Sequence, residues 1–282
     1  MVVARQQVLV LNPQAGGLSD EAEKAVVRAL SGFDVIRLEA DQDLAAVVTA
    51  SDVAPDATIV VAGGDGTVGA AARALVGTDR RLGIVPVGTF NNFARALGIP
   101  LQPGAAARAL SAGKPATVTL GRVNGEPFLE AASLGLFGDL INLGEAAKEL
   151  HYGELLQRVR GLSAPSFEYR LDGDVREAGR ARALVIANTP STGALVTVGS
   201  VTPEEGVLEL SVFGPGRRAQ ILRRLALRAL PFLDRPHPGR RVRRVRIETD
   251  PRISVYADAG RVGETPAEIA IDVHALKVLL PA

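Results

Sequence analysis

The stretch Thr58-Ile-Val-Val-Ala-Gly-Gly-Asp-Gly-Thr67 decides how the first half of this chain folds. It opens with a continuous apolar, β-branched run, which is typical of a strand covered on both faces. Three glycines follow, and apolar residues then recur at helical spacing from Val68 onward. Glycines let a backbone approach a ligand closely, and a helix start offers unpaired N–H groups that suit phosphate. The stretch therefore predicts a phosphate-binding loop, with an ordinary tight turn between strand and helix as the alternative.

Strands and helices alternate on both sides of this loop. Such alternation implies a parallel sheet with helices on both faces, so we expect a doubly wound α/β domain over residues 1–121. Apolar runs predict strands at 7–11, 35–38, 58–62 and 82–87, and helical spacing predicts helices at 20–30, 44–49, 68–76 and 90–97.

The pattern changes after residue 121 to short strand-like runs, with turns such as Asn124-Gly125 and Asp172-Gly173. These dipeptides between strands are strong hairpin signals. We expect a mainly antiparallel β-sandwich domain over residues 122–275, and a last strand near 276–282 that is a candidate to return to the first domain. The strand candidates are 117–122, 127–133, 166–171, 177–187, 207–213, 242–249, 252–257 and 268–271, and the helix candidates are 140–148, 153–162 and 217–233.

Composition limits the classes of function. The chain has 282 residues, 47% hydrophobic and 22% charged, which fits an ordinary folded protein of about two domains. The absence of cysteine excludes disulfides, thiolate metal sites and cysteine nucleophiles. Because no apolar run reaches about 18 residues and the first residues lack a signal-peptide pattern, we expect a cytoplasmic protein without a spanning helix.

A basic block lies at residues 215–246, which carry eleven arginines and a single acid, Asp234. Within it, residues 217–233 place leucines and alanines on one helical face and arginines on the other. This pattern favours an interfacial helix that contacts anionic lipid, and a helix packed on the sheet with a solvated basic face is the alternative. Nucleic acid is not expected as a partner, since aromatic residues make up only 4% of the chain.

Polar residues follow the predicted parallel strands at their carboxyl ends, where open sheets bind ligands. Asp65 suggests either Mg²⁺ beside a phosphate or a polar role in holding the loop. Thr67 offers its hydroxyl to phosphate or caps the helix. The strand at 82–87 is followed by Gly88-Thr89, Asn91 and Asn92, for which helix capping is the alternative, and a third loop spans residues 12–17.

These loops resemble a known family. Asn12-Pro13 with Gly16-Gly17, then Gly63-Gly-Asp-Gly-Thr67, then Pro86-x-Gly-Thr-x-Asn91, are similar in order and spacing to the diacylglycerol kinase catalytic family. The likeness is greatest to its soluble bacterial lipid kinases, which are related to sphingosine kinase. It continues through Glu130-Ala-Ala-Ser-Leu-Gly-Leu136, the region from Asn188 to Glu209, and Val255-Tyr-Ala-Asp-Ala-Gly260 with Thr265-Pro266.

The resemblance implies a lipid kinase that binds ATP and Mg²⁺ and transfers the γ-phosphoryl group to a lipid hydroxyl in a cleft between two domains. Asp65 would organise the nucleotide and its metal, and Asp258 would be the general base. Glu205 and Glu209 stand where the family has Asp, in a region linked to a structural Mg²⁺. The nucleotide-binding residues carried over are Asn12, Gly63, Gly64, Gly66, Thr67, Gly88, Thr89 and Asn91.

The chain departs from the family pattern at Gly260, where a Glu is usual, and at Ala259 and Asn92. Two alternatives to the lipid kinase therefore stay open. One is a kinase of a soluble acceptor such as NAD, because NAD kinases share the glycine loop. The other is a catalytically weakened nucleotide- or lipid-binding sensor. The choice between a diacylglycerol-like and a sphingoid lipid, and a homodimer through strand edges, also stay open.

Overall fold

The structure, a computed structural model, describes residues 4–136, 165–192, 196–197, 199–214, 239–258 and 260–282. The chain forms two compact units, Met1–Thr119 with Val273–Ala282, and Leu120–Asp272. The helices predicted at 140–148, 153–162 and 217–233 lie outside the described residues.

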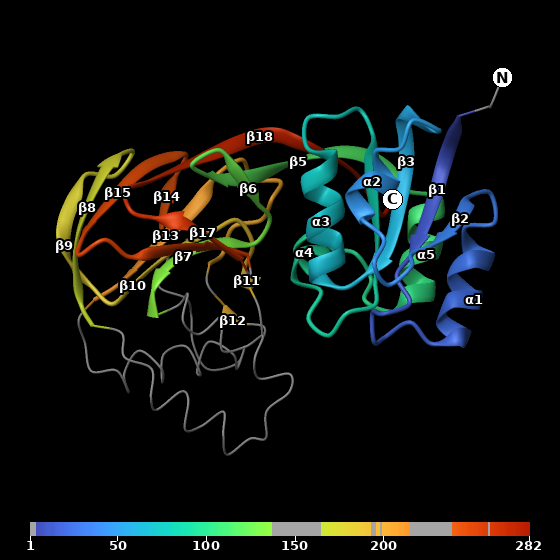
Figure 1. Cartoon of the computed structure of the whole chain (residues 1–282), viewed down its shortest axis with the longest axis horizontal. Helices are drawn as coiled ribbons and strands as arrows, with labels where there is room; N and C mark the ends of the chain where they lie inside the picture. Colours follow the sequence, from blue (N-terminus) through green and yellow to red (C-terminus); the bar gives the residue numbers. More distant parts are fainter. Residues whose placement is uncertain (1–3, 137–164, 193–195, 198, 215–238, 259) are drawn as a thin grey trace, which may run out of the picture. The chain divides into compact units, whose positions relative to one another are not determined.

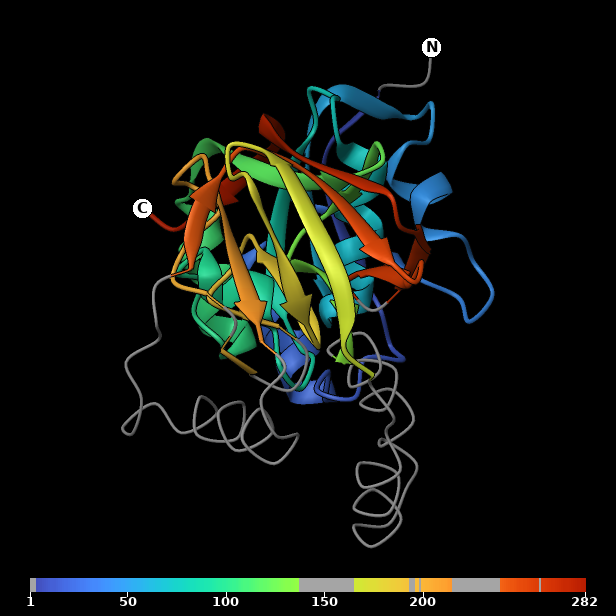
Figure 2. The same cartoon turned by 90° about the vertical axis from the view of Figure 1, so that its left-hand side faces the viewer.

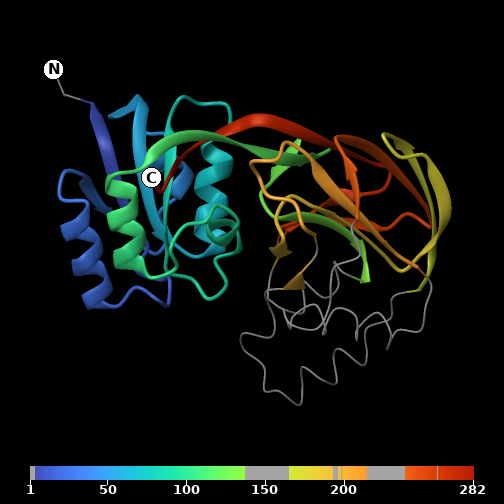
Figure 3. The ribbon, with the colours of Figure 1, turned by 180° about the vertical axis from the view of Figure 1, so that it is seen from behind.

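The first unit contains a parallel sheet with the strand order β2-β1-β3-β4-β18. Helices α2 and α3 lie in front of this sheet in Figure 1, and Figure 3 shows α1 and α5 on its other face. The doubly wound α/β prediction is therefore confirmed. The elements are β1 (Arg5–Leu11), α1 (Asp20–Ala29), β2 (Asp34–Arg37), α2 (Leu44–Val48), β3 (Val53–Gly63), α3 (Asp65–Leu75), β4 (Arg81–Pro86), α4 (Asn92–Ala96) and α5 (Pro103–Ser111).

The core of this unit explains why the strands are apolar throughout. Leu9, Val60 and Val85 come from adjacent strands and pack against Val26 of α1 and Leu110 of α5. Strands covered on both faces have no position left for polar side chains, so the period-two pattern is absent here. Packing on both faces of the parallel sheet fixes where its strands end. The loops that follow the strands therefore begin at fixed positions.

The second unit is an antiparallel sandwich of two sheets, which Figure 2 turns toward the reader. One sheet has the order β18-β15-β8-β9 with β5 and β6, and the other has the order β14-β13-β10-β7-β16-β17. The predicted sandwich is confirmed. The elements are β5 (Lys114–Val123), β6 (Glu126–Phe128), β7 (Ala131–Gly135), β8 (Phe167–Gly173), β9 (Glu177–Ala181), β10 (Ala183–Ala187), the short pair β11 (Ser191–Thr192) and β12 (Val196–Thr197), β13 (Leu208–Phe213), β14 (Arg240–Val242), β15 (Arg244–Asp250), β16 (Ser254–Ala257), β17 (Gly260–Glu264) and β18 (Ala267–Leu280).

Several strand predictions were wrong in how the chain is divided. The strand predicted at 127–133 falls on β6 and β7, and the one at 242–249 on β14 and β15, and each pair lies in different sheets. Residues 177–187 form two strands rather than one, because β9 pairs with β8 while β10 pairs with β7 and β13 of the other sheet. The change of sheet occurs at Arg182, whose N–H donates to the carbonyl oxygen of Phe213. Conversely, residues 268–271 and 276–280 belong to one long strand, β18, which pairs with β15 near its start and with β4 near its end.

Two helices also differ from expectation. Helix α5 was not predicted, although Gln102 caps it by accepting from the N–H of Ala105 and Pro103 occupies its first turn. Helix α4 starts at Asn92 rather than at residue 90, because Asn91 has a left-handed backbone with φ of 52°. That turn at Asn91 shapes the loop after β4.

Leu134→Ala in β7 should strongly destabilise the sandwich. Its side chain is fully buried in a core shared by both sheets. Removing it should lower the free energy of unfolding by about 2–5 kcal/mol, because the buried contacts are lost and a cavity remains. Val273→Ala is the control, since Val273 is 53% exposed and its loss should cost less than about 0.5 kcal/mol. Denaturant titration followed by circular dichroism measures both, and equal losses would contradict the assigned core.

Candidate active site

Three loops meet at the carboxyl ends of the parallel strands of the first unit. The loops after β3 and β4 touch, since a Cβ atom added to Gly88 would lie 2.6 Å from the Cα atom of Gly64. The loop after β1 joins them, because the N–H of Gly17 donates to the carbonyl oxygen of Val87 at 3.0 Å. A Cβ atom on Gly17 would lie only 2.4 Å from that oxygen. Glycine is therefore needed at these positions for the loops to approach.

Asn12 and Thr67, both predicted nucleotide-binding residues, are brought together by this arrangement. The Nδ2 of Asn12 donates to the hydroxyl of Thr67 at 2.9 Å, and its Oδ1 accepts from the N–H of Gln14 at 3.0 Å. Gly63 lies directly against Thr67, since a Cβ atom there would be 2.5 Å from the Thr67 Cβ. The Thr67 hydroxyl accepts one hydrogen bond and keeps its own hydrogen to donate.

Asp65, the first residue of α3, holds the loop after β4. Its Oδ2 accepts from the N–H of Asn91 and its Oδ1 from the N–H of Asn92, both at 2.8 Å. Burial raises the pKa of Asp65 above its ordinary value of 3.8, and hydrogen bonds from the backbone of Asn91, Asn92 and Phe93 oppose that rise. The carboxylate therefore holds the loop after β4, which is one of the two roles that the sequence left open.

Asn91 closes the same loop from within. Its Nδ2 donates to the carbonyl oxygen of Gly88 at 2.7 Å, and its Oδ1 accepts from the N–H of Gly88 at 3.0 Å. This pair of hydrogen bonds accounts for the left-handed backbone of Asn91, which Asn tolerates better than most residues. Gly66 and Thr89 are exposed beside this framework, so the loops present backbone to solvent at their tips.

Asp258, the predicted base, lies at the end of β16 in the second unit. Its Oδ1 accepts from the N–H of Glu130 at 2.8 Å and from that of Leu129 at 3.2 Å. Its own N–H donates to the carbonyl oxygen of Ala131 at 2.9 Å, and its φ is 50°. The carboxylate is thus oriented by the backbone that leads into β7.

Asn188 supports that backbone and was not among the predicted site residues. It is fully buried, its N–H donates to the carbonyl oxygen of Glu130 at 2.8 Å, and its Nδ2 donates to that of Leu129 at 2.9 Å. The same two residues therefore receive hydrogen bonds from Asn188 and give them to Asp258. Asn188 belonged to a motif visible in the sequence, but no local pattern connects it with residues 129–130.

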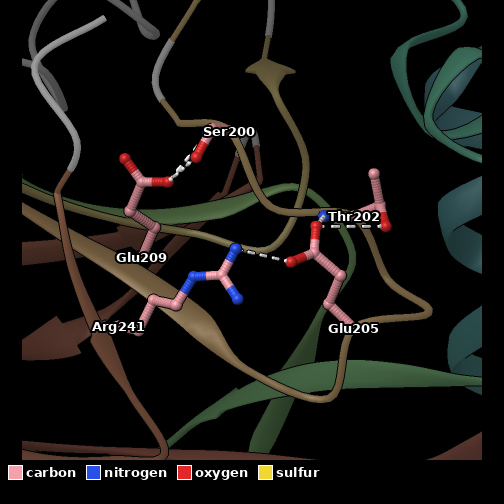
Figure 4. A network of polar contacts seen from close by, with 5 residues as sticks. All are labelled: Ser200, Thr202, Glu205, Glu209 and Arg241. Atoms are coloured by element: carbon pink, nitrogen blue, oxygen red, sulfur yellow. Dashed lines mark hydrogen bonds and ion pairs between the residues drawn. The ribbon is translucent and has the colours of Figure 1, made fainter.

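Glu205 and Glu209, which were predicted as metal ligands together with Asp65, lie in one polar network (Figure 4). Glu209 is 2% exposed and accepts hydrogen bonds from Ser200 and Gly239. Glu205 accepts from the N–H of its neighbour Thr202. Within the described ranges, no three His, Cys, Asp or Glu side chains gather as a metal site.

The basic block at 215–246 is described only from residue 239 onward. There four of its arginines form ion pairs with local carboxylates. The region expected to contact lipid, 217–233, lies outside the described residues, and no described helix is long and apolar enough to cross a membrane. The ion pairs are Arg240–Glu177, Arg241–Glu205, Arg244–Glu268, and Arg246 with Glu248 and Glu268.

Comparison with known proteins agrees with this architecture. A model of the diacylglycerol kinase catalytic domain matches residues 6–123, and a model of the YegS C-terminal NAD kinase beta sandwich-like domain matches residues 141–280. A diacylglycerol kinase of Mycobacterium tuberculosis is 31% identical, covering 96% of this chain and 93% of that protein. A Pseudomonas aeruginosa protein described as "Probable lipid kinase YegS-like" is 35% identical, covering 73% of this chain and 71% of that protein.

Solved structures share the fold. The crystal structure of a diacylglycerol kinase from Bacillus anthracis superposes with a TM-score of 0.78 at 22% identity, over 98% of this chain and 97% of that one. An NAD kinase from Archaeoglobus fulgidus in complex with ATP is more distant, with a TM-score of 0.51 at 14% identity, over 98% and 93%. The fold and loops together define a two-domain, nucleotide-using kinase. The chain belongs to the diacylglycerol kinase catalytic-domain family and is a phosphotransferase.

Asp65→Asn should change how stability depends on pH. Because burial raises the pKa of Asp65, the folded state binds its proton more tightly than the unfolded state. Its contribution to stability is therefore fully present below pH 3.8 and is lost as the pH rises through the raised value. The free energy of unfolding of wild type minus that of Asp65→Asn should decrease from about pH 3.5 to pH 7. Denaturant titrations across this range measure the difference. A difference that grows with pH would show that the backbone hydrogen bonds lower the pKa of Asp65 more than burial raises it.

Proposed function

We propose that this enzyme transfers the γ-phosphoryl group of ATP, taken with Mg²⁺, to the hydroxyl of a diacylglycerol-like or sphingoid lipid. The observation that carries the proposal is the contact between the loops of Gly64 and Gly88, held by Asp65. It supports a site for a triphosphate because these loops lie at the strand ends, with Gly66 and Thr89 exposed. The names of the M. tuberculosis and P. aeruginosa relatives support a lipid as acceptor.

Asp65 fits a metal ion that accompanies the nucleotide. Its carboxylate is held beside the glycine loop by the backbone N–H groups of Asn91, Asn92 and Phe93. Burial disfavours its ionised form, so a nearby cation would stabilise the charge. When bound, Mg²⁺ would supply positive charge to the phosphates.

Asp258 is proposed to accept the proton of the lipid hydroxyl. As the hydroxyl oxygen forms its bond to the γ-phosphorus, the bond from that phosphorus to the β,γ-bridging oxygen breaks and ADP leaves. The hydroxyl proton passes to a carboxylate oxygen of Asp258, whose orientation is fixed by Leu129 and Glu130. Asn188 would act as a positioning residue through these two.

A panel assay with radiolabelled ATP tests the acceptor class. Diacylglycerol, sphingosine and NAD would be offered separately, the lipids in anionic vesicles, and labelled product would be partitioned between organic solvent and water. We expect label in the organic phase only. Label in the aqueous phase with NAD would identify a soluble-acceptor kinase instead. ATP binding by calorimetry without transfer to any acceptor would identify a sensor.

Asp258→Asn should lower kcat by about 10²–10⁴-fold, because general base catalysis contributes that much. The KM for ATP should stay near the wild-type value, since nucleotide contacts are proposed in the first unit. Asp272→Asn is a matched control, since Asp272 forms an ion pair with Arg122 and belongs to no loop of the proposed site. An unchanged kcat in Asp258→Asn would remove this residue from the chemistry.

A further inference from the structure

The family resemblance implies a structural Mg²⁺ near Glu205 and Glu209, and the contacts of these residues disagree with it. We infer that this part of the second unit is held by a metal-independent clasp, defined as Glu205, Glu209, Ser200, Gly239 and Arg241. In the clasp, backbone and side-chain donors satisfy the two carboxylates, and Arg241 supplies the positive charge. The inference concerns stability of the nucleotide-free chain and does not depend on the proposed kinase reaction.

Glu209 joins two segments that are far apart in the sequence. Its Oε2 accepts from the N–H of Ser200 at 2.8 Å and from the Ser200 hydroxyl at 2.7 Å, and its Oε1 accepts from the N–H of Gly239 at 2.8 Å. A buried carboxylate is costly unless it is hydrogen-bonded, and here both oxygens have donors. A Cβ atom on Gly239 would lie 2.5 Å from the Glu209 Cγ, so the approach requires glycine at 239.

Glu205 closes a turn and faces Arg241. The N–H of Thr202 donates to its Oε1 at 2.9 Å, and the N–H of Glu205 donates back to the carbonyl oxygen of Thr202 at 3.0 Å. Its Oε2 accepts from the Nη2 of Arg241 at 2.8 Å. Glu reaches one methylene further than the Asp that is usual here, which lets one side chain contact both the turn and the guanidinium.

Arg241 lies next to Glu209 in the sheet and forms its ion pair with Glu205. Its Cα is paired directly with that of Glu209 across β13 and β14, and opposite charges at such positions attract. Figure 4 shows the guanidinium extending toward Glu205 with Glu209 nearby. A single cationic side chain thus pairs with Glu205 from the strand position directly opposite Glu209.

A divalent ion does not fit this arrangement. Mg²⁺ requires near-octahedral oxygen ligands at about 2.0–2.1 Å. Each carboxylate oxygen of Glu205 and Glu209 already faces an N–H or O–H group. Bringing the metal in would break several of these hydrogen bonds and place it beside the guanidinium of Arg241. The clasp therefore takes the place of the metal rather than binding it.

Thermal unfolding of the nucleotide-free full chain tests the inference. Wild type and Glu205→Gln would each be melted in EDTA and in excess MgCl₂. We expect the Tm of wild type to be the same in both buffers, or any rise with Mg²⁺ to be equal in the two proteins, because the ion then acts elsewhere. A rise in wild type that Glu205→Gln abolishes would overturn the inference.

Substitutions within the clasp test the role of Arg241. Arg241→Gln should lower the Tm by about 1–4 °C in EDTA, since Arg241 is largely exposed and such pairs are weak. Glu209→Gln should lower it further, because its amide would direct N–H hydrogens at Ser200 or Gly239. The double variant Glu205→Gln with Arg241→Gln should lose less than the sum of the single losses.

Arg246→Gln is the matched control for these measurements. It removes the ion pairs of Arg246 with Glu248 on β15 and Glu268 on β18, neither of which is a clasp residue, so its effect should be additive with that of Glu205→Gln. Additive losses for Arg241 and Glu205 as well would overturn the assignment of Arg241 as the cation of the clasp.

Discussion

The hydrogen bonds from Asn91 and Asn92 to Asp65 are the interaction on which the nucleotide-binding end of the first unit depends. Two glycine loops from neighbouring strands touch there. Contact between their backbones does not by itself fix the position of one loop relative to the other. A carboxylate at the start of α3 fixes the second loop relative to the first. Because burial raises the pKa of Asp65, keeping its carboxylate ionised in this position costs free energy. Such perturbed groups are typical of sites that bind a ligand.

The same device recurs at the other carboxylates that the family motifs single out. Asp258 accepts from the backbone before β7, and Glu209 accepts from the backbone at 200 and 239. In each case an acid joins its own strand or helix to a segment distant in sequence. The acidic residues of the family motifs in this chain therefore hold the structure together in addition to any chemical role. Truncation to alanine removes both tasks at once, whereas the isosteric amide removes the charge and keeps one oxygen that can accept a hydrogen bond.

The sequence was sufficient for the elements whose signals are local. Runs such as 58–62 and the glycines at 63–66 predicted the sheet and its loops, because buried strands and tight turns constrain nearby residues. The division of 177–187 at Arg182 and the union of 267–280 in β18 were not predictable, since only the pairing partners decide them. The site residues divide in the same way between local signals and partners distant in the sequence. Asp65 and Asn12 stood out by motif, whereas Asn188 and Arg241 became relevant only through partners far along the chain.

Gly260, where the family pattern has Glu, is not required by the fold. A Cβ atom there would meet only the carbonyl oxygen of Ala257, at an ordinary distance of 3.8 Å, and its φ is not among the positive ones. Packing would therefore accept a side chain at this position, and the missing carboxylate is a chemical difference rather than a steric one. The nearby Glu264 is engaged with Arg261 on β17. The proposed proton acceptance in this segment consequently rests on Asp258 and on the backbone of Leu129 and Glu130 that orients it.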